Sequence, residues 1–120
     1  MSILDVSNAG DLHPVGHFPA ASHANSVELE GTRAYLSTSF HGLIVLDITD
    51  PEAPDSLTTI SEAGSSLSVA VQDGLAFVAS GADDFLIISL ANLEEAQVIG
   101  SFETGKVQDV AIQGMNAYVC

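Results

Sequence analysis

The stretch DVAIQGMNAYV at residues 109–119 recurs twice earlier in the chain, as SVAVQDGLAFV at 68–78 and as SVELEGTRAYL at 26–36. Successive copies start 42 and then 41 residues apart, and their apolar, turn and aromatic positions coincide. In each copy, two short β-prone segments flank a turn that contains Gly, which is typical of a β-hairpin. A recurrence at one period indicates a repeat architecture.

A second landmark follows at the same period. It is the apolar run LIVLDI at 43–48, with the equivalents FLIISL at 85–90 and MSILDV at 1–6. After it come a polar turn and a short outer segment that ends in an apolar residue: Phe18, Ile60 or Phe102. A near-continuous apolar run predicts a strand that is covered on both faces. We name the two hairpin strands a and b, the apolar strand c, and the more polar outer strand d.

The 120-residue chain is therefore predicted to be all-β, as one segment of a β-propeller. It contains three four-stranded antiparallel units of about 42 residues, at approximately 1–37, 43–79 and 85–120, with b–c loops at 38–42 and 80–84. Each unit has the strand order c-d-a-b. A propeller needs at least four blades, so three units cannot close alone.

The ends of the repeat predict how the ring is completed. Cys120 corresponds to Ser37 and Met1 to Leu43, so strand b at the end of the chain lacks a following strand c. Unpaired edges of this kind pair readily with another chain. We expect Met1–Val6 of one copy to pair with Ala117–Cys120 of another, giving a homodimer that closes a six-bladed ring.

These residues resemble a known family. The pattern at 109–119, together with ILDVSN at 3–8, is similar to the LVIVD repeat of bacterial and archaeal β-propellers, and the resemblance covers essentially the whole chain. The chain departs from the pattern where Ser26 and Ser68 stand in place of the Asp found at 109. It departs again where Ser89 stands in place of the Asp found at 5 and 47. The resemblance implies a propeller fold and a location at the cell surface or outside the cell, but no defined activity.

The charge balance narrows the range of partners. Sixteen acidic and two basic residues give a formal net charge of −14, which excludes nucleic-acid binding through a basic footprint and disfavours docking on anionic lipid. No apolar run is long enough to cross a membrane. The first residues lack a basic segment followed by a long apolar one, so no secretory signal peptide is expected. Cys120 is the single cysteine, and no intrachain disulfide can form.

The d–a and b–c loops of a propeller lie on one face around the central channel, where we expect ligands to bind. These loops contain residues 22–25, 40–42, 62–66, 82–84 and 105–108. Within them, the candidate ligand-binding residues are His23, Asn25, His41, Asp83 and Asp84. His23, His41, Asp83 and Asp84 are also weak candidates for holding a divalent metal, because imidazole and carboxylate are common metal ligands. Their spacing in the sequence matches no known metal-binding motif. No cofactor is expected.

His13 and His17 have the spacing of a helical metal-binding pair, but four residues of strand span about 13 Å, which is too far for one ion. We expect both in an irregular lead-in to an outer strand. Nucleophilic catalysis finds no support, since no serine lies in a Gly-x-Ser-x-Gly turn. Adjacent carboxylates on a strand point to opposite faces and cannot act as an acid/base pair.

The sequence thus favours a non-catalytic scaffold or binding module of a cell-surface or secreted protein, whose ligand is another protein or a glycan. Two alternatives stay open. One is a metal-dependent ligand binder or enzyme that uses the loop face around the channel. The other is an engineered or excised structural fragment of a larger propeller.

The net charge generates a first prediction. Repulsion among the carboxylates destabilises the compact state, and added salt screens it. The melting temperature should therefore rise between about 10 mM and about 500 mM NaCl, a range over which the Debye length falls steeply. A flat or falling melting temperature in differential scanning fluorimetry would show that the acidic residues are already compensated.

Overall fold

The computed structural model describes residues 1–19, 23–81 and 84–120. In these residues the fold consists of antiparallel β-sheets and two single-turn 3-10 helices, at Ser61–Ala63 and Leu93–Glu95. The predicted all-β class is confirmed, and two four-stranded antiparallel sheets are present among the described residues.

Four sheets follow one another along the chain. The first is a pair of strands, β1 (Ser2–Asp5) and β2 (His13–His17). The second is the four-stranded sheet of β3 (Ala24–Glu30), β4 (Arg33–Thr38), β5 (Gly42–Asp47) and β6 (Asp55–Ile60). The third has the same order, with β7 (Ser66–Gln72), β8 (Leu75–Ser80), β9 (Asp84–Ser89) and β10 (Gln97–Glu103). The fourth is again a pair, β11 (Val110–Gln113) and β12 (Asn116–Val119).

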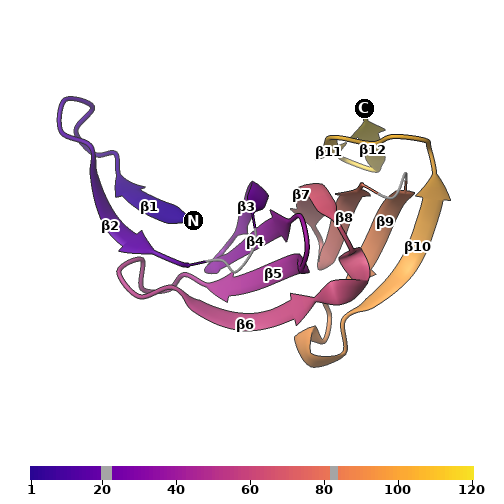
Figure 1. Ribbon diagram of the computed structural model, residues 1–120, viewed down its shortest axis with the longest axis horizontal. Helices are drawn as coiled ribbons and strands as arrows, with labels where there is room; N and C mark the ends of the chain where they lie inside the picture. The colour runs from indigo at the N-terminus through magenta and orange to yellow at the C-terminus, as the bar shows by residue number, and fades with distance from the viewer. Residues whose placement is uncertain (20–22, 82–83) are drawn as a thin grey trace.

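The described chain therefore holds two complete blades with a half-blade at each end. The half-blade β1–β2 supplies strands c and d, and the half-blade β11–β12 supplies strands a and b. Figure 1 shows the four sheets arranged along an open arc, with the half-blades at its two tips. The radius of gyration is 14.4 Å, slightly above the value of about 13.5 Å for a compact chain of this length. The ring is not closed within one chain.

The inner hairpins form where the turn residues allow a positive φ. Asp73 and Gly74 have φ values of 53° and 74°, so both central residues of the β7–β8 turn are left-handed. Gly31 and Gly114 each have φ of 60° at the first central position of their turns. Such turns match the right-handed twist of paired strands, which explains the tight a–b connections that the sequence predicted.

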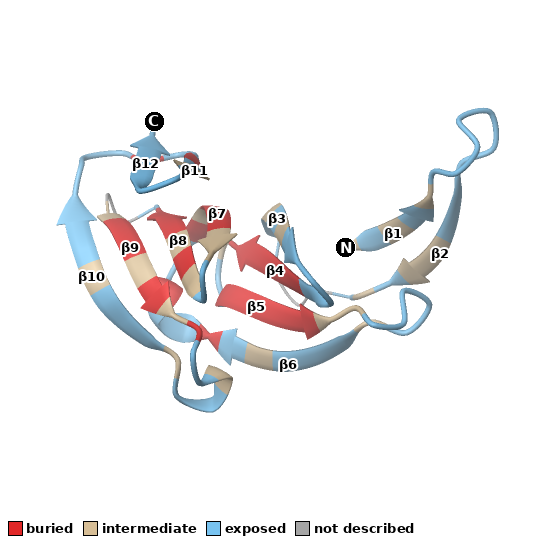
Figure 2. Cartoon of the chain, turned by 180° about the vertical axis from the view of Figure 1, so that it is seen from behind, coloured by how far each residue is buried: buried red, intermediate tan, exposed pale blue. Residues whose placement is uncertain are grey.

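The core lies between the blades, because side chains of the central strands alternate between two neighbours. In β5, Leu43 and Val45 pack in one cluster with residues of the following blade, whereas Ile44 and Leu46 pack towards Met1 and the preceding half-blade. All four β5 side chains are buried. In Figure 2 the buried residues concentrate on the middle strands of the complete blades, while the outer strands β6 and β10 and the half-blades are largely exposed. The prediction of a doubly covered strand c is confirmed for β5 and β9, whereas β1 is only partly covered.

One expectation was wrong. His13 and His17 are not in an irregular lead-in but are the first and last residues of β2. They are paired with opposite ends of β1: His13 lies opposite Asp5, and His17 lies opposite Ser2. The strand register shifts between Ile3 and Leu4, which lie opposite Gly16 and Pro14, the residues that obscured the strand in the sequence. Gly16 lies so close to the backbone of Pro51 that an added Cβ atom would clash with its carbonyl oxygen.

The backbone at Gly42 generates a second prediction. Its φ is +76°, and a Cβ atom there would lie 2.2 Å from the carbonyl oxygen of Ile60. Gly42→Ala should therefore lower the free energy of unfolding by at least about 2 kcal/mol in urea denaturation. Gly31→Ala is the matched control, because its φ is +60° but nothing lies within 4 Å of the added atom. It should cost about 1 kcal/mol, the lower end of the cost of a left-handed conformation for a residue with a Cβ atom. Equal losses for the two variants would mean that the Ile60 contact contributes nothing.

Candidate functional site

The strand registers bring the predicted loops to one edge of each blade. In the first complete blade, Ala24 pairs with Thr38, and Thr38 pairs with Gly42. In the second, Ser66 pairs with Ser80, and Ser80 pairs with Asp84. The b–c loops and the d–a loops therefore leave the sheets at the same edge, which we call the loop edge. Residues 20–22 and 82–83 of these loops lie outside the described residues.

Hydrogen bonds from short polar side chains fix the loop edge of the first complete blade. The Thr38 hydroxyl donates to the carbonyl of Gly42 at 2.9 Å and accepts from the backbone N–H of His41 at 3.1 Å. The Asn25 side-chain amide donates to the carbonyl of Ser66 in the next blade at 2.8 Å and to the hydroxyl of Ser39 at 3.2 Å. Asn25, a predicted ligand-binding residue, thus serves as a bridge between blades.

The two histidines of the loop edge lie in connected loops. His23 is exposed and its carbonyl accepts from the backbone N–H of Ser39, two residues before His41, which is also exposed. Asp84 belongs to the next blade, at the start of β9. Asp83 lies outside the described residues. Among the residues that are described, no three His, Cys, Asp or Glu side chains are grouped so that they could hold a metal ion. The metal set that includes Asp83 stays a prediction.

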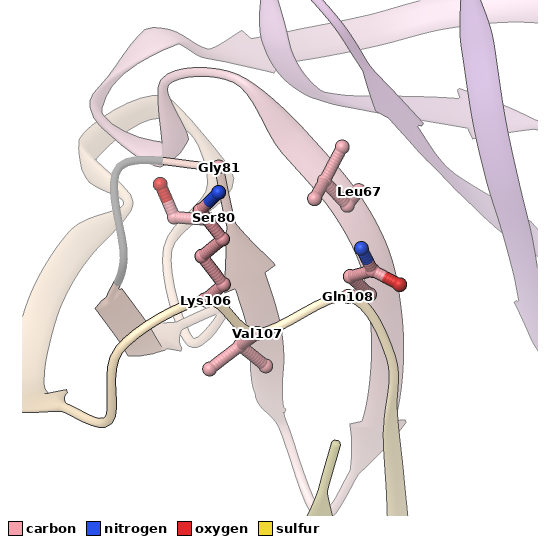
Figure 3. A pocket seen from close by; sticks show the side chains of 6 residues that line it. All are labelled: Leu67, Ser80, Gly81, Lys106, Val107 and Gln108. Atoms are coloured by element: carbon pink, nitrogen blue, oxygen red, sulfur yellow. The ribbon is translucent and has the colours of Figure 1, made fainter.

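A small cavity opens at the loop edge between the second complete blade and the half-blade β11–β12. It has a volume of about 100 Å³ and is lined by Leu67, Ser80, Gly81, Lys106, Val107 and Gln108. Figure 3 shows the Lys106 side chain extending beside Ser80. The sequence placed residues 105–108 and the b–c loop at 80–84, which contains Ser80 and Gly81, on this edge but missed Leu67. The repeat position of Leu67, equivalent to Asn25, was the available signal.

Larger, mostly apolar cavities open at the two ends of the arc. The N-end cavity, of about 240 Å³, is lined by Met1, Ser2, Ile3, Val27, Leu29, Ala34, Ile48 and Pro51. The C-end cavity, of about 350 Å³, lies between β7–β10 and β11–β12 and is lined by Gln72, Asp73, Leu75, Phe77, Phe85, Ile87, Ile112, Gly114, Met115, Asn116 and Ala117. Each adjoins a half-blade that has two strands where a complete blade has four.

Asp5 and Asp47, at the end of strand c in their repeats, accept hydrogen bonds that hold the turn between strands c and d. The Asp47 carboxylate accepts from the backbone N–H of Thr49 at 2.8 Å and from its hydroxyl at 2.6 Å. Asp5 accepts from the backbone N–H of Ser7 at 2.8 Å. Hydrogen bonds from the hydroxyl and the N–H of these partners lower the pKa of both carboxyls below the ordinary value. These aspartates are therefore structural capping groups of the c–d turn.

The fold is that of a repeat protein built from four-stranded antiparallel blades, and its repeats can be assigned to a family. The LVIVD repeat matches residues 21–58, 63–104 and 104–120. The chain belongs to the LVIVD-repeat family. The first two matches coincide with the two complete blades and the third with the half-blade β11–β12. None of the curated proteins compared with the chain matches it. Both helices in the described ranges are single turns, and neither could span a membrane.

The turn at Asp47 generates a third prediction. Because the pKa of Asp47 is lowered in the fold, its contribution to stability is complete above the ordinary pKa of 3.8 and is lost as the pH falls through the lower folded-state value. Asp47→Asn should lower the melting temperature at pH 7, and the deficit relative to the wild type should shrink below about pH 4. Asp11→Asn, in an exposed turn, removes the same charge and is the control for net charge. A deficit that is independent of pH would contradict the capping role.

Proposed function

We propose that this chain is a non-catalytic propeller module that completes its ring by pairing with a second copy of itself. The observation that carries the proposal is the complementarity of its two half-blades. One end carries strands c and d, and the other carries strands a and b, which together make one complete blade. A two-fold arrangement would join both pairs of half-blades at once and give six blades.

The exposed edge strands support the same pairing. In complete blades, strand b pairs with strand c along β4–β5 and β8–β9. In the half-blades, β12 pairs only with β11, and β1 pairs only with β2, within the described structure. An edge of unpaired N–H and C=O groups is a template for another strand. Since β12 is a strand b and β1 is a strand c, each is the natural neighbour of the other.

The loop edge is the proposed binding face, for another protein or a glycan. Equivalent positions there carry different chemistry from blade to blade: His23 corresponds to Ser65 and Lys106, and His41 corresponds to Asp83. Variable loops on a constant scaffold suit recognition. Of the proposed ligand-binding residues, His23, Asn25, His41 and Asp84 lie at this edge. Asp83, which lies outside the described residues, is included in the proposal from its repeat position. Family membership supports a cell-surface or secreted setting.

The fourth prediction tests the assembly. Size exclusion coupled to light scattering should give about twice the 12.4 kDa chain mass. The measurement should be made at about 150 mM and about 500 mM NaCl, so that charge repulsion cannot conceal association. A folded, monodisperse monomer at both salt concentrations would refute the proposal. A trimer would retain the strand exchange and change the number of blades.

A further inference from the structure

We infer that two side chains of the second copy, Tyr118 and Leu4, are the anchors that fill the N-end and C-end cavities. This inference rests on the proposed pairing of copies and specifies its contacts. The interface between the blades β3–β6 and β7–β10 is complete and serves as the template. The two incomplete interfaces are those beside the half-blades β1–β2 and β11–β12.

In the template interface an aromatic residue of strand b fills the space between blades. Tyr35 of β4 is 1% exposed. It belongs to one cluster with Val69, Ala76 and Leu90 of the following blade. Leu43 and Val45, from strand c of the same blade as Tyr35, complete that cluster. The interface therefore needs one aromatic side chain from strand b and two aliphatic side chains from strand c.

The N-end cavity has this same lining without the aromatic residue. Val27, Ala34 and Ile48 line it at the repeat positions of Val69, Ala76 and Leu90. Met1 and Ile3 line it at the positions of Leu43 and Val45.

In the N-end cavity, the place that Tyr35 takes in the template would be filled by a residue of strand b. The half-blade β1–β2 has no strand b. The equivalent residue in β12 is Tyr118, which is 56% exposed at the other end of the arc. Tyr118 of a second copy therefore has the identity and the repeat position that the N-end cavity requires.

The C-end cavity lacks the opposite half of the same interface. Phe85 and Ile87 line it at the repeat positions of Leu43 and Val45. In the template, these positions pack in one cluster with Ile88 and Leu90.

Leu4 of β1 corresponds to Ile88, and Val6, just after β1, corresponds to Leu90. Leu4 is 49% exposed, whereas Ile88 is 0% exposed. At the position of Leu86 a second copy would bring the smaller Ser2. Phe85, which lines this cavity where the template has Leu43, is the larger residue and offsets part of that difference.

The register follows from the internal copies. In β4–β5, Leu36 pairs with Ile44 and Tyr35 pairs with Val45. The same register places Val119 opposite Ser2 of the second copy. A slip by one residue would turn Tyr118 and Leu4 to the wrong faces of their strands, so the two cavities and the strand edge select one register.

The fifth prediction tests the anchors through the dimer dissociation constant, measured by sedimentation or dilution light scattering. Tyr118→Ala should raise the constant by at least about 100-fold, because removing a buried aromatic side chain costs about 3–5 kcal/mol. Tyr118→Phe should change it by less than about fivefold, since Phe77 occupies the equivalent position of the other complete blade. Leu4→Ala should raise the constant by at least about tenfold. Leu57→Ala should leave it unchanged, because Leu57 is similarly exposed and lines neither cavity.

A disulfide test checks the register without removing either anchor. In a Cys120→Ser background, Ser2→Cys with Val119→Cys should give a covalent dimer on oxidation, because opposed residues of antiparallel strands lie about 4.5–5.5 Å apart between Cα atoms. Ile3→Cys with Val119→Cys places the thiols on opposite faces and should not cross-link. If the wild type is a dimer but Tyr118→Ala and Leu4→Ala leave its dissociation constant unchanged, this inference is overturned and the pairing proposal stands. The same holds if only the pair Ile3→Cys and Val119→Cys cross-links. A wild-type monomer overturns both.

Discussion

A blade of this protein is apolar on both faces, and every other feature of the fold depends on that constraint. Strand β5 shows it directly, because Val45 packs forward and Ile44 packs backward, and both are buried. A sheet with two apolar faces needs a neighbour on each, so an open row of blades has unsatisfied faces at its ends. Linear repeat proteins solve this problem with polar capping repeats. In the described residues of this protein, a two-stranded half-blade beside an apolar cavity lies at each end of the arc.

Apolar packing holds the blades together but does not by itself set the angle between them, because it is non-directional. Directional contacts run along the inner strands. The Ser68 hydroxyl donates to the Asp109 carboxylate of the next sheet at 2.6 Å, and the Gln72 amide donates to the carbonyl of Gly114 at 2.8 Å. The departure from the family pattern at Ser68 thus has a structural use, since the serine supplies the donor for the aspartate that the following repeat retains. Together with Asn25, these bonds fix successive blades at one orientation.

The sequence was sufficient for the repeat, the hairpins and the doubly covered strand c, because each follows from local periodicity and turn chemistry. It failed where neighbouring units meet. The amide of Asn25 bridges two blades, and the cavity beside Lys106 draws Leu67 and Ser80 from another blade. A period identifies equivalent positions within units but does not give the contacts between units. The strand at His13–His17 was missed for a different reason: Pro14 and Gly16 are unfavourable in regular strands. Here the register shifts at these residues, and Gly16 allows the close approach of the Pro51 backbone.

Electrostatics and packing act on assembly over different distances. Two copies carry twice the charge of −14, and their repulsion extends over about 8–10 Å before salt screens it. In the proposed dimer, the junction contacts would act only where atoms touch and would determine which register forms, whereas the charge would affect how readily two copies meet. The proposed two-fold geometry would also add cooperativity. If β12 of one copy paired with β1 of the other, the remaining β1 and β12 edges would belong to the same complex, and the second junction would form at the high effective concentration of an intramolecular step. Under that proposal a closed ring would be favoured over an open pair, even with a weak single junction.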